Sequence, residues 1–131
     1  MVFPFLAGLA LTIALLIVSI WTGLAREKGV YPITLIAIAL FYVVFAIEWG
    51  NNNQIFLNAV IAGLFMLIAI VGYRISFTLI AFGLVLHGVF DLLYAFMGSS
   101  PAPHWWAPFC LAVDVLLGLF LFFMIAKKRI A

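Results

Sequence analysis

Apolar residues fill five long runs of the chain, and short groups of polar residues separate these runs. The runs cover residues of about 3–25, 30–47, 55–73, 75–97 and 105–126. Each run is close to the roughly 20 residues that a helix needs to cross about 30 Å of hydrocarbon. We therefore predict an all-α integral membrane protein, a bundle of five transmembrane helices that forms one domain over residues 1–131.

The polar segments between the runs contain residues that typically end or begin helices. AREKG follows the first run, GNNNQ follows the second, and GSSPAPHWWAP leads into the fifth. The third and fourth runs abut, and one helix of their combined length would exceed the bilayer thickness about twofold. The segment GYRIS at residues 72–76 is therefore expected to be a tight hairpin, with Gly72 as a left-handed helix cap.

Composition excludes the soluble classes of protein. Hydrophobic residues make up 69% of the chain and charged residues 8%, with a mean hydropathy of +1.40, whereas a soluble domain carries roughly 25% charged residues. The expected surrounding is a lipid bilayer, and nucleic acid is not an expected partner. The single cysteine, Cys110, excludes an intrachain disulfide, so the fold must depend on helix packing.

The positive charges indicate an orientation in the membrane. They occupy the first loop, the third loop and the C-terminal tail, as Arg26, Lys28, Arg74, Lys127, Lys128 and Arg129. Lys and Arg concentrate in cytoplasmic loops, so five spans predict an N-terminus outside and a C-terminus inside. The basic residues follow the first run and do not precede it, so we expect this run to be a retained helix and not a secretory signal. Trp49, Trp105 and Trp106 would then lie at the outer interface.

Polar residues inside the runs collect on the side away from these cations. His87 and Asp91 in HGVFD stand one helical turn apart on one face, and so do Cys110 and Asp114 in the fifth run. Counting about 1.5 Å per residue places His87 about 15 Å deep, Asp91 about 9 Å and Asp114 about 9 to 14 Å. Consecutive helices are usually neighbours, so the two faces are expected to meet.

Further polar residues extend this group into a predicted ligand-binding pocket open to the outside. Glu48, Asn58 and His104 are predicted nearer the outer surface, and Tyr42 could extend the group inward. Together with His87, Asp91 and Asp114 they form the predicted pocket. An ionised carboxylate in hydrocarbon normally needs a cation beside it, but every Lys and Arg is predicted on the far side. The carboxylates must be protonated, hydrogen-bonded, wetted by a cavity, or neutralised by a bound cation.

The leading functional interpretation is binding or conduction of a small cation, a proton or a protonatable ligand. His, Asp and Cys side chains are good metal ligands, so His87, Asp91, Asp114 and Cys110 form a candidate metal site, and a divalent metal ion is the candidate cofactor. HxxxD spacing alone is a weak signal, and the same pair could serve to hold helices together. A bundle of five helices has few with which to line a pathway, so transport would require a homo-oligomer.

Two other classes of function stay open from the sequence. One is an enzyme that acts on a lipid, with the acids and His87 as general acid and base, although no catalytic residue can be assigned. The other is an accessory subunit of a larger membrane complex. A retinal Schiff base is excluded because no lysine lies inside a span. Small residues predict two surfaces for close helix packing. One is formed by Gly83, Gly88 and Ala95, and the other by Ala59, Gly63 and Gly72.

One resemblance covers nearly the whole chain. HGVFD, HWWAPFC and the DV that follows, preceded by YPITLIAIALFYVVFA in the second run, resemble an uncharacterised family of small bacterial multi-pass membrane proteins. The resemblance implies a location in the bacterial inner membrane and supplies no activity. Such proteins carry a further histidine about one turn after the HxxxD pair, where this chain has Tyr94, and this departure weakens the metal interpretation.

Overall fold

The structure is a computed structural model that describes residues 2–98 and 100–130, and its regular elements within these ranges are all helical. The α-helices are α1 (Val2–Thr22), α2 (Val30–Trp49), α3 (Asn52–Ile75), α4 (Phe77–Phe96) and α5 (Trp106–Ala126), with a short 3-10 helix η1 (Leu24–Arg26) after α1. All five α-helices are long and apolar enough to span a membrane. The prediction of five apolar helices of membrane-spanning length is therefore confirmed. Their ends differ from the predicted ones by less than one helical turn.

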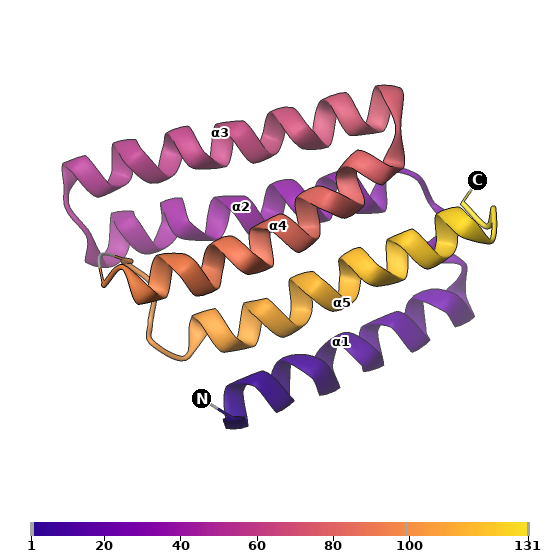
Figure 1. Ribbon diagram of the computed structural model, residues 1–131, viewed down its shortest axis with the longest axis horizontal. Helices are drawn as coiled ribbons and strands as arrows, with labels where there is room; N and C mark the ends of the chain where they lie inside the picture. Colours follow the sequence, from indigo (N-terminus) through magenta and orange to yellow (C-terminus); the bar gives the residue numbers. More distant parts are fainter. Residues whose placement is uncertain (1, 99, 131) are drawn as a thin grey trace.

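The five helices lie roughly side by side, with α4 in the middle of the bundle (Figure 1). The contact between α4 and α5 is the most extensive, followed by the contacts of α2 with α3 and of α1 with α5. Helix α4 also contacts α2 and α3. Helix α1 lies at the edge of the bundle along α5 and buries few residues, among them Gly8 and Thr12.

Two groups of buried side chains hold the bundle together. The larger one contains Leu35, Ile80, Leu84 and Leu121, all at most 1% exposed, and it joins α2, α4 and α5 with residues of α3. The smaller one is formed largely by aromatic side chains of α2, α4 and α5, and its buried members are Tyr42, Tyr94, Trp106 and Cys110.

The turn between α3 and α4 is as tight as predicted, but the prediction that Gly72 is its left-handed cap is wrong. Helix α3 continues through Gly72 to Ile75, and Ser76 ends it with an extended backbone. A Cβ atom on Gly72 would lie 2.5 Å from Cγ1 of Ile80. Glycine therefore lets α4 fold back closely against the last turn of α3, without a positive φ angle at Gly72.

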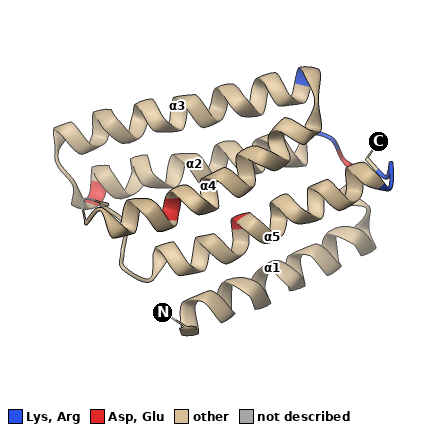
Figure 2. Cartoon of the chain, viewed as in Figure 1, with Lys and Arg blue, Asp and Glu red and all other residues tan. Residues whose placement is uncertain are grey.

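Charged residues divide between the two ends of the bundle (Figure 2). The six Lys and Arg residues lie where α1, α3 and α5 end, which we call the basic end, and Glu27 is the acid found there. Glu48 lies near the end of α2 at the other end, which we call the opposite end. Asp91 and Asp114 lie inside the bundle on α4 and α5.

Candidate functional site

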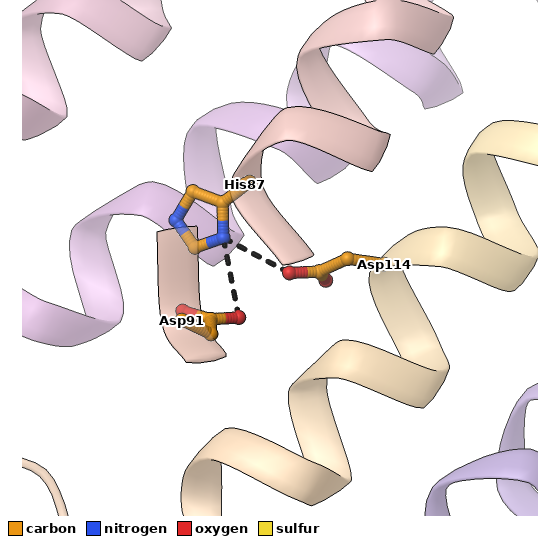
Figure 3. Close-up of side chains that lie close together, drawn as sticks. All are labelled: His87, Asp91 and Asp114. Atoms are coloured by element: carbon orange, nitrogen blue, oxygen red, sulfur yellow. Dashed lines mark hydrogen bonds and ion pairs between the residues drawn. The ribbon is translucent and has the colours of Figure 1, made fainter. Parts of the chain in front are cut away.

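His87, Asp91 and Asp114 come together inside the bundle, where each side chain is at most 1% exposed. Nδ1 of His87 donates a hydrogen bond to Oδ2 of Asp114 over 2.9 Å, and the same nitrogen lies 3.5 Å from Oδ2 of Asp91 (Figure 3). One imidazole nitrogen therefore interacts with both carboxylates. We call these three residues the His/Asp group.

The spacing of residues along α4 and two close approaches of α4 and α5 at glycines bring the group together. His87 and Asp91 share a face of α4 because they are four residues apart. Gly88, beside His87, allows α5 to approach closely, since a Cβ atom there would lie 3.2 Å from Cβ of Asp114. One turn farther along α5, Gly118 lies so close to α4 that its Cβ atom would be 3.0 Å from the carbonyl oxygen of Ala81.

The carboxylates lack enough donors within the described part of the chain. Both oxygens of Asp91 and Oδ1 of Asp114 are buried and form no hydrogen bond of good geometry with a described group. The Asp91 carboxylate interacts with Nδ1 of His87 over 3.5 Å and with the Tyr42 hydroxyl. No described Lys or Arg forms an ion pair with either residue. Buried polar atoms are almost always hydrogen-bonded, so two buried carboxylates that share so few donors call for further protons or a cation.

Aromatic rings enclose the imidazole. The edge or face of Phe65 contacts His87 at a ring-centroid distance of 4.7 Å, Phe90 at 5.7 Å and Tyr42 at 6.1 Å. These rings keep the effective dielectric constant low around the charges, which strengthens the interactions of the carboxylates with any cation close to them.

A second polar contact lies beside the group. Nδ2 of Asn58 donates to the hydroxyl of Tyr94 over 3.1 Å and to the carbonyl oxygen of Gln54 over 2.7 Å. The Tyr94 ring lies 5.3 Å from that of Tyr42, which in turn packs beside His87. Asn58 therefore fixes the aromatic wall of the site without touching the carboxylates through any hydrogen bond recorded for it.

A cleft of about 280 Å³ opens at the opposite end of the bundle, between the end of α4 and the loop that leads into α5. Its lining includes Tyr42, Leu92, Ser100, His104 and Ala107. Tyr42 is 2% exposed and borders both this cleft and the His/Asp group. The cleft therefore ends next to the site, with the Tyr42 ring between them.

The predicted site residues separate into three sets. His87, Asp91 and Asp114 are brought together, and Tyr42 and Asn58 lie in the buried surroundings described above. Glu48 and His104 are exposed near the opposite end and do not belong to the group. Cys110 is buried among Tyr42, Tyr94 and Trp106, one turn from Asp114, but is not one of the described residues whose potential ligand atoms converge.

Three surrounding residues were not singled out as parts of the site. Phe65 supplies the nearest ring to His87, and Trp106, expected at the membrane interface, is 7% exposed and packs 4.8 Å from Phe45. The sequence indicates Tyr94 only as a departure from the resembling family. It could have been found by extending the His87 and Asp91 face by three residues, whereas no sequence signal identifies Phe65.

The spacing of the ligand atoms suits a metal ion. One potential ligand atom from each of His87, Asp91 and Asp114 lies within 4.8 Å of the other two. The distances from Nδ1 of His87 to Oδ2 of Asp114 and of Asp91, 2.9 and 3.5 Å, are close to the roughly 3.4 Å that separates neighbouring ligands around tetrahedral zinc. A metal ion would replace the Nδ1 proton of His87 and leave a position for a further ligand.

The chain was compared with protein-family models, with curated proteins and with solved structures. None of the three comparisons gives a match. The chemistry of this site therefore has to be argued from its own residues.

Proposed function

We propose that the His/Asp group binds a small cation in exchange for protons. The observation that supports this proposal is the pair of buried carboxylates that share one imidazole nitrogen, with three of their four oxygens forming no hydrogen bond of good geometry with a described group. A neutral imidazole with two ionised carboxylates carries a charge of −2, which one divalent cation or two protons would neutralise. The same three side chains can thus be neutral in a proton-loaded form and in a metal-loaded form.

The ligand set favours a transition-metal ion such as Zn²⁺ over Mg²⁺. Imidazole nitrogen is a good ligand for zinc, copper and iron, whereas Mg²⁺ prefers oxygen ligands and retains several waters. The aromatic walls leave little room for such a hydrated ion. Monovalent cations or protons alone would fit a conducting role, which in a bundle this small calls for a homo-oligomer.

The proposed route to the site starts at the cleft of the opposite end. Tyr42 separates this cleft from His87, so movement of its ring would open or close the route. We further propose that the opposite end faces the outside of a bacterial inner membrane. The support is the asymmetry of the six Lys and Arg residues, since such residues concentrate on the cytoplasmic side.

Labelling of single cysteines tests this orientation. In a Cys110→Ala background, cysteines placed at Asn52 and Ser100 should react with a membrane-impermeant thiol reagent in intact cells. Cysteines at Arg74 and Lys128 should react only after the membrane is permeabilised. Labelling of the Asn52 position from the cytoplasmic side alone would overturn the proposed orientation and the outward-facing route.

Cation binding is tested on the purified protein in lipid nanodiscs, by metal analysis and titration calorimetry with Zn²⁺, Mn²⁺ and Mg²⁺. We expect about one Zn²⁺ per chain, with proton release. Each displaced proton should weaken the apparent affinity about tenfold per unit decrease in pH. Asp114→Asn, Asp91→Asn and His87→Gln should each lower the affinity at least about 100-fold, because each removes one of three ligands. Asp114→Asn should largely preserve the fold, since asparagine has the shape of the protonated acid.

Matched controls come from the two predicted residues that lie outside the group. His104→Gln and Glu48→Gln remove the same types of side chain from exposed positions and should leave the affinity within about twofold. His104 lines the cleft, but an equilibrium affinity does not depend on the route to the site. Equal losses in these controls would contradict a site at His87. Binding of no metal ion and no pH-dependent proton release would overturn the proposal. In that case, a tightly held lipid would favour the lipid enzyme, and co-purifying proteins the accessory subunit.

A further inference from the structure

A separate groove of about 540 Å³ lies at the basic end, between the start of α2 and the end of α3. Its lining is Gly29, Pro32, Ile33, Ile70, Tyr73 and Arg74. Ile33 is 67% exposed and Ile70 56% exposed. The groove therefore offers an apolar wall on the surface of the bundle, far along the helices from the His/Asp group, with a phenol and a guanidinium at its basic end.

Arg74 has no counter-ion in the part of the chain that the structure describes. Its side chain is exposed in the last turn of α3 and makes neither an ion pair nor a hydrogen bond with another described residue. Among the described residues at this end of the bundle, Glu27 is the one acidic side chain beside six Lys and Arg side chains. Gly29 precedes the first turn of α2, whose helix dipole adds positive potential beside the groove.

We propose that this groove binds one anionic phospholipid. The acyl chains would lie along Ile33 and Ile70, and the phosphate would accept hydrogen bonds from the Arg74 guanidinium and the Tyr73 hydroxyl. Charge complementarity argues for an anionic headgroup, because basic pockets between transmembrane helices bind such lipids and a guanidinium matches the geometry of a phosphate. The apolar lining and the length of α2 and α3 argue for a lipid and not for a free phosphate ion.

Native mass spectrometry of the detergent-solubilised full chain tests the proposal, with phosphatidylglycerol and phosphatidylcholine of identical acyl chains as the probes. The wild type should bind one phosphatidylglycerol at least about fivefold more tightly than phosphatidylcholine. Arg74→Gln should abolish this preference. Lys127→Gln lowers the net charge equally but changes an exposed residue outside the groove, and should retain the preference. Inorganic phosphate, added alone, should not compete at millimolar concentration.

A second pair of variants tests the groove itself at constant charge. A Cβ atom on Gly29 would meet no described atom within 4 Å, and its φ angle of −69° suits any residue, so Gly29→Trp should fold and fill the groove. Phosphatidylglycerol binding should then fall at least about fivefold. Gly63→Trp adds the same bulk at an exposed position of α3 and should have no effect.

Three results would overturn the proposal. Equal binding of both lipids by the wild type would show that no headgroup is recognised. Equal losses in Arg74→Gln and Lys127→Gln would show general attraction of anions to the basic end. Unchanged binding in Gly29→Trp would place the lipid elsewhere. None of these results bears on cation binding by the His/Asp group, which these variants leave intact.

Discussion

His87→Leu is expected to lower the free energy of unfolding by about 3–5 kcal/mol at neutral pH. Nδ1 of His87 is the one described nitrogen that reaches both Asp91 and Asp114 in the buried site. Leucine occupies a similar volume, so the loss comes mainly from stranding two buried carboxylates and not from an empty space. Equilibrium unfolding of the purified protein in detergent measures the effect.

A variant that removes all three side chains of the His/Asp group is expected to be more stable than His87→Leu. Replacing His87, Asp91 and Asp114 together by leucine should recover most of the lost stability, because no charge is left stranded, while metal binding stays abolished. His104→Leu changes an exposed histidine and should alter stability by less than about 0.5 kcal/mol. A loss in His87→Leu no larger than in His104→Leu would mean that the carboxylates do not depend on His87.

Much of the fold could be predicted because a chain that spans a bilayer must satisfy its backbone hydrogen bonds internally, which leaves few possible structures. Five apolar runs of nearly constant length have few arrangements other than five helices. The meeting of His87, Asp91 and Asp114 also followed from simple geometry. One pair lies a helical turn apart, and the third residue lies at a similar depth on the next helix.

Depth alone could not decide which polar residues belong to the site. Counting residues gives a position along the helix axis, but the side of the helix that faces the core depends on packing. Glu48 is therefore exposed on α2, although it lies toward the opposite end, where the counting of residues also placed the site. His104 is exposed because it lies in the turn before α5 and not in a helix. The same limitation affected the small residues, since Gly83 and Gly88 are buried whereas Ala59, Gly63 and Ala95 are exposed.

The order of the helices along the chain does not indicate that α1 packs on α5. Gly8 makes this contact possible, because a Cβ atom there would lie 2.5 Å from the carbonyl oxygen of Phe109. Thr12 lies on the same face, and its hydroxyl donates to the carbonyl oxygen of Gly8 over 2.8 Å. Small residues show where two helices approach closely, but they do not identify the partner.

Gly118→Leu is expected to lower the stability and to disrupt the proposed cation site. A Cβ atom at this position would lie 3.0 Å from the carbonyl oxygen of Ala81 and 3.2 Å from the backbone nitrogen of Val85. Both are backbone atoms of α4, so no side-chain rotation can relieve the clash and the two helices must separate. Such overpacking costs about 1–3 kcal/mol, and loss of the His87 hydrogen bond to Asp114 adds about 1.5–3 kcal/mol.

Gly8→Leu provides the comparison that separates a local effect from general damage to α5. It should release α1 from the opposite side of α5 and lower stability, but the contact between α4 and α5 does not involve Gly8. Zn²⁺ affinity should therefore fall at least about tenfold in Gly118→Leu and stay within about threefold in Gly8→Leu. Gly63→Leu, at an exposed position, should change neither quantity. Equal loss of affinity in Gly8→Leu and Gly118→Leu would indicate that the site depends on the whole bundle and not on the close approach of α4 to α5.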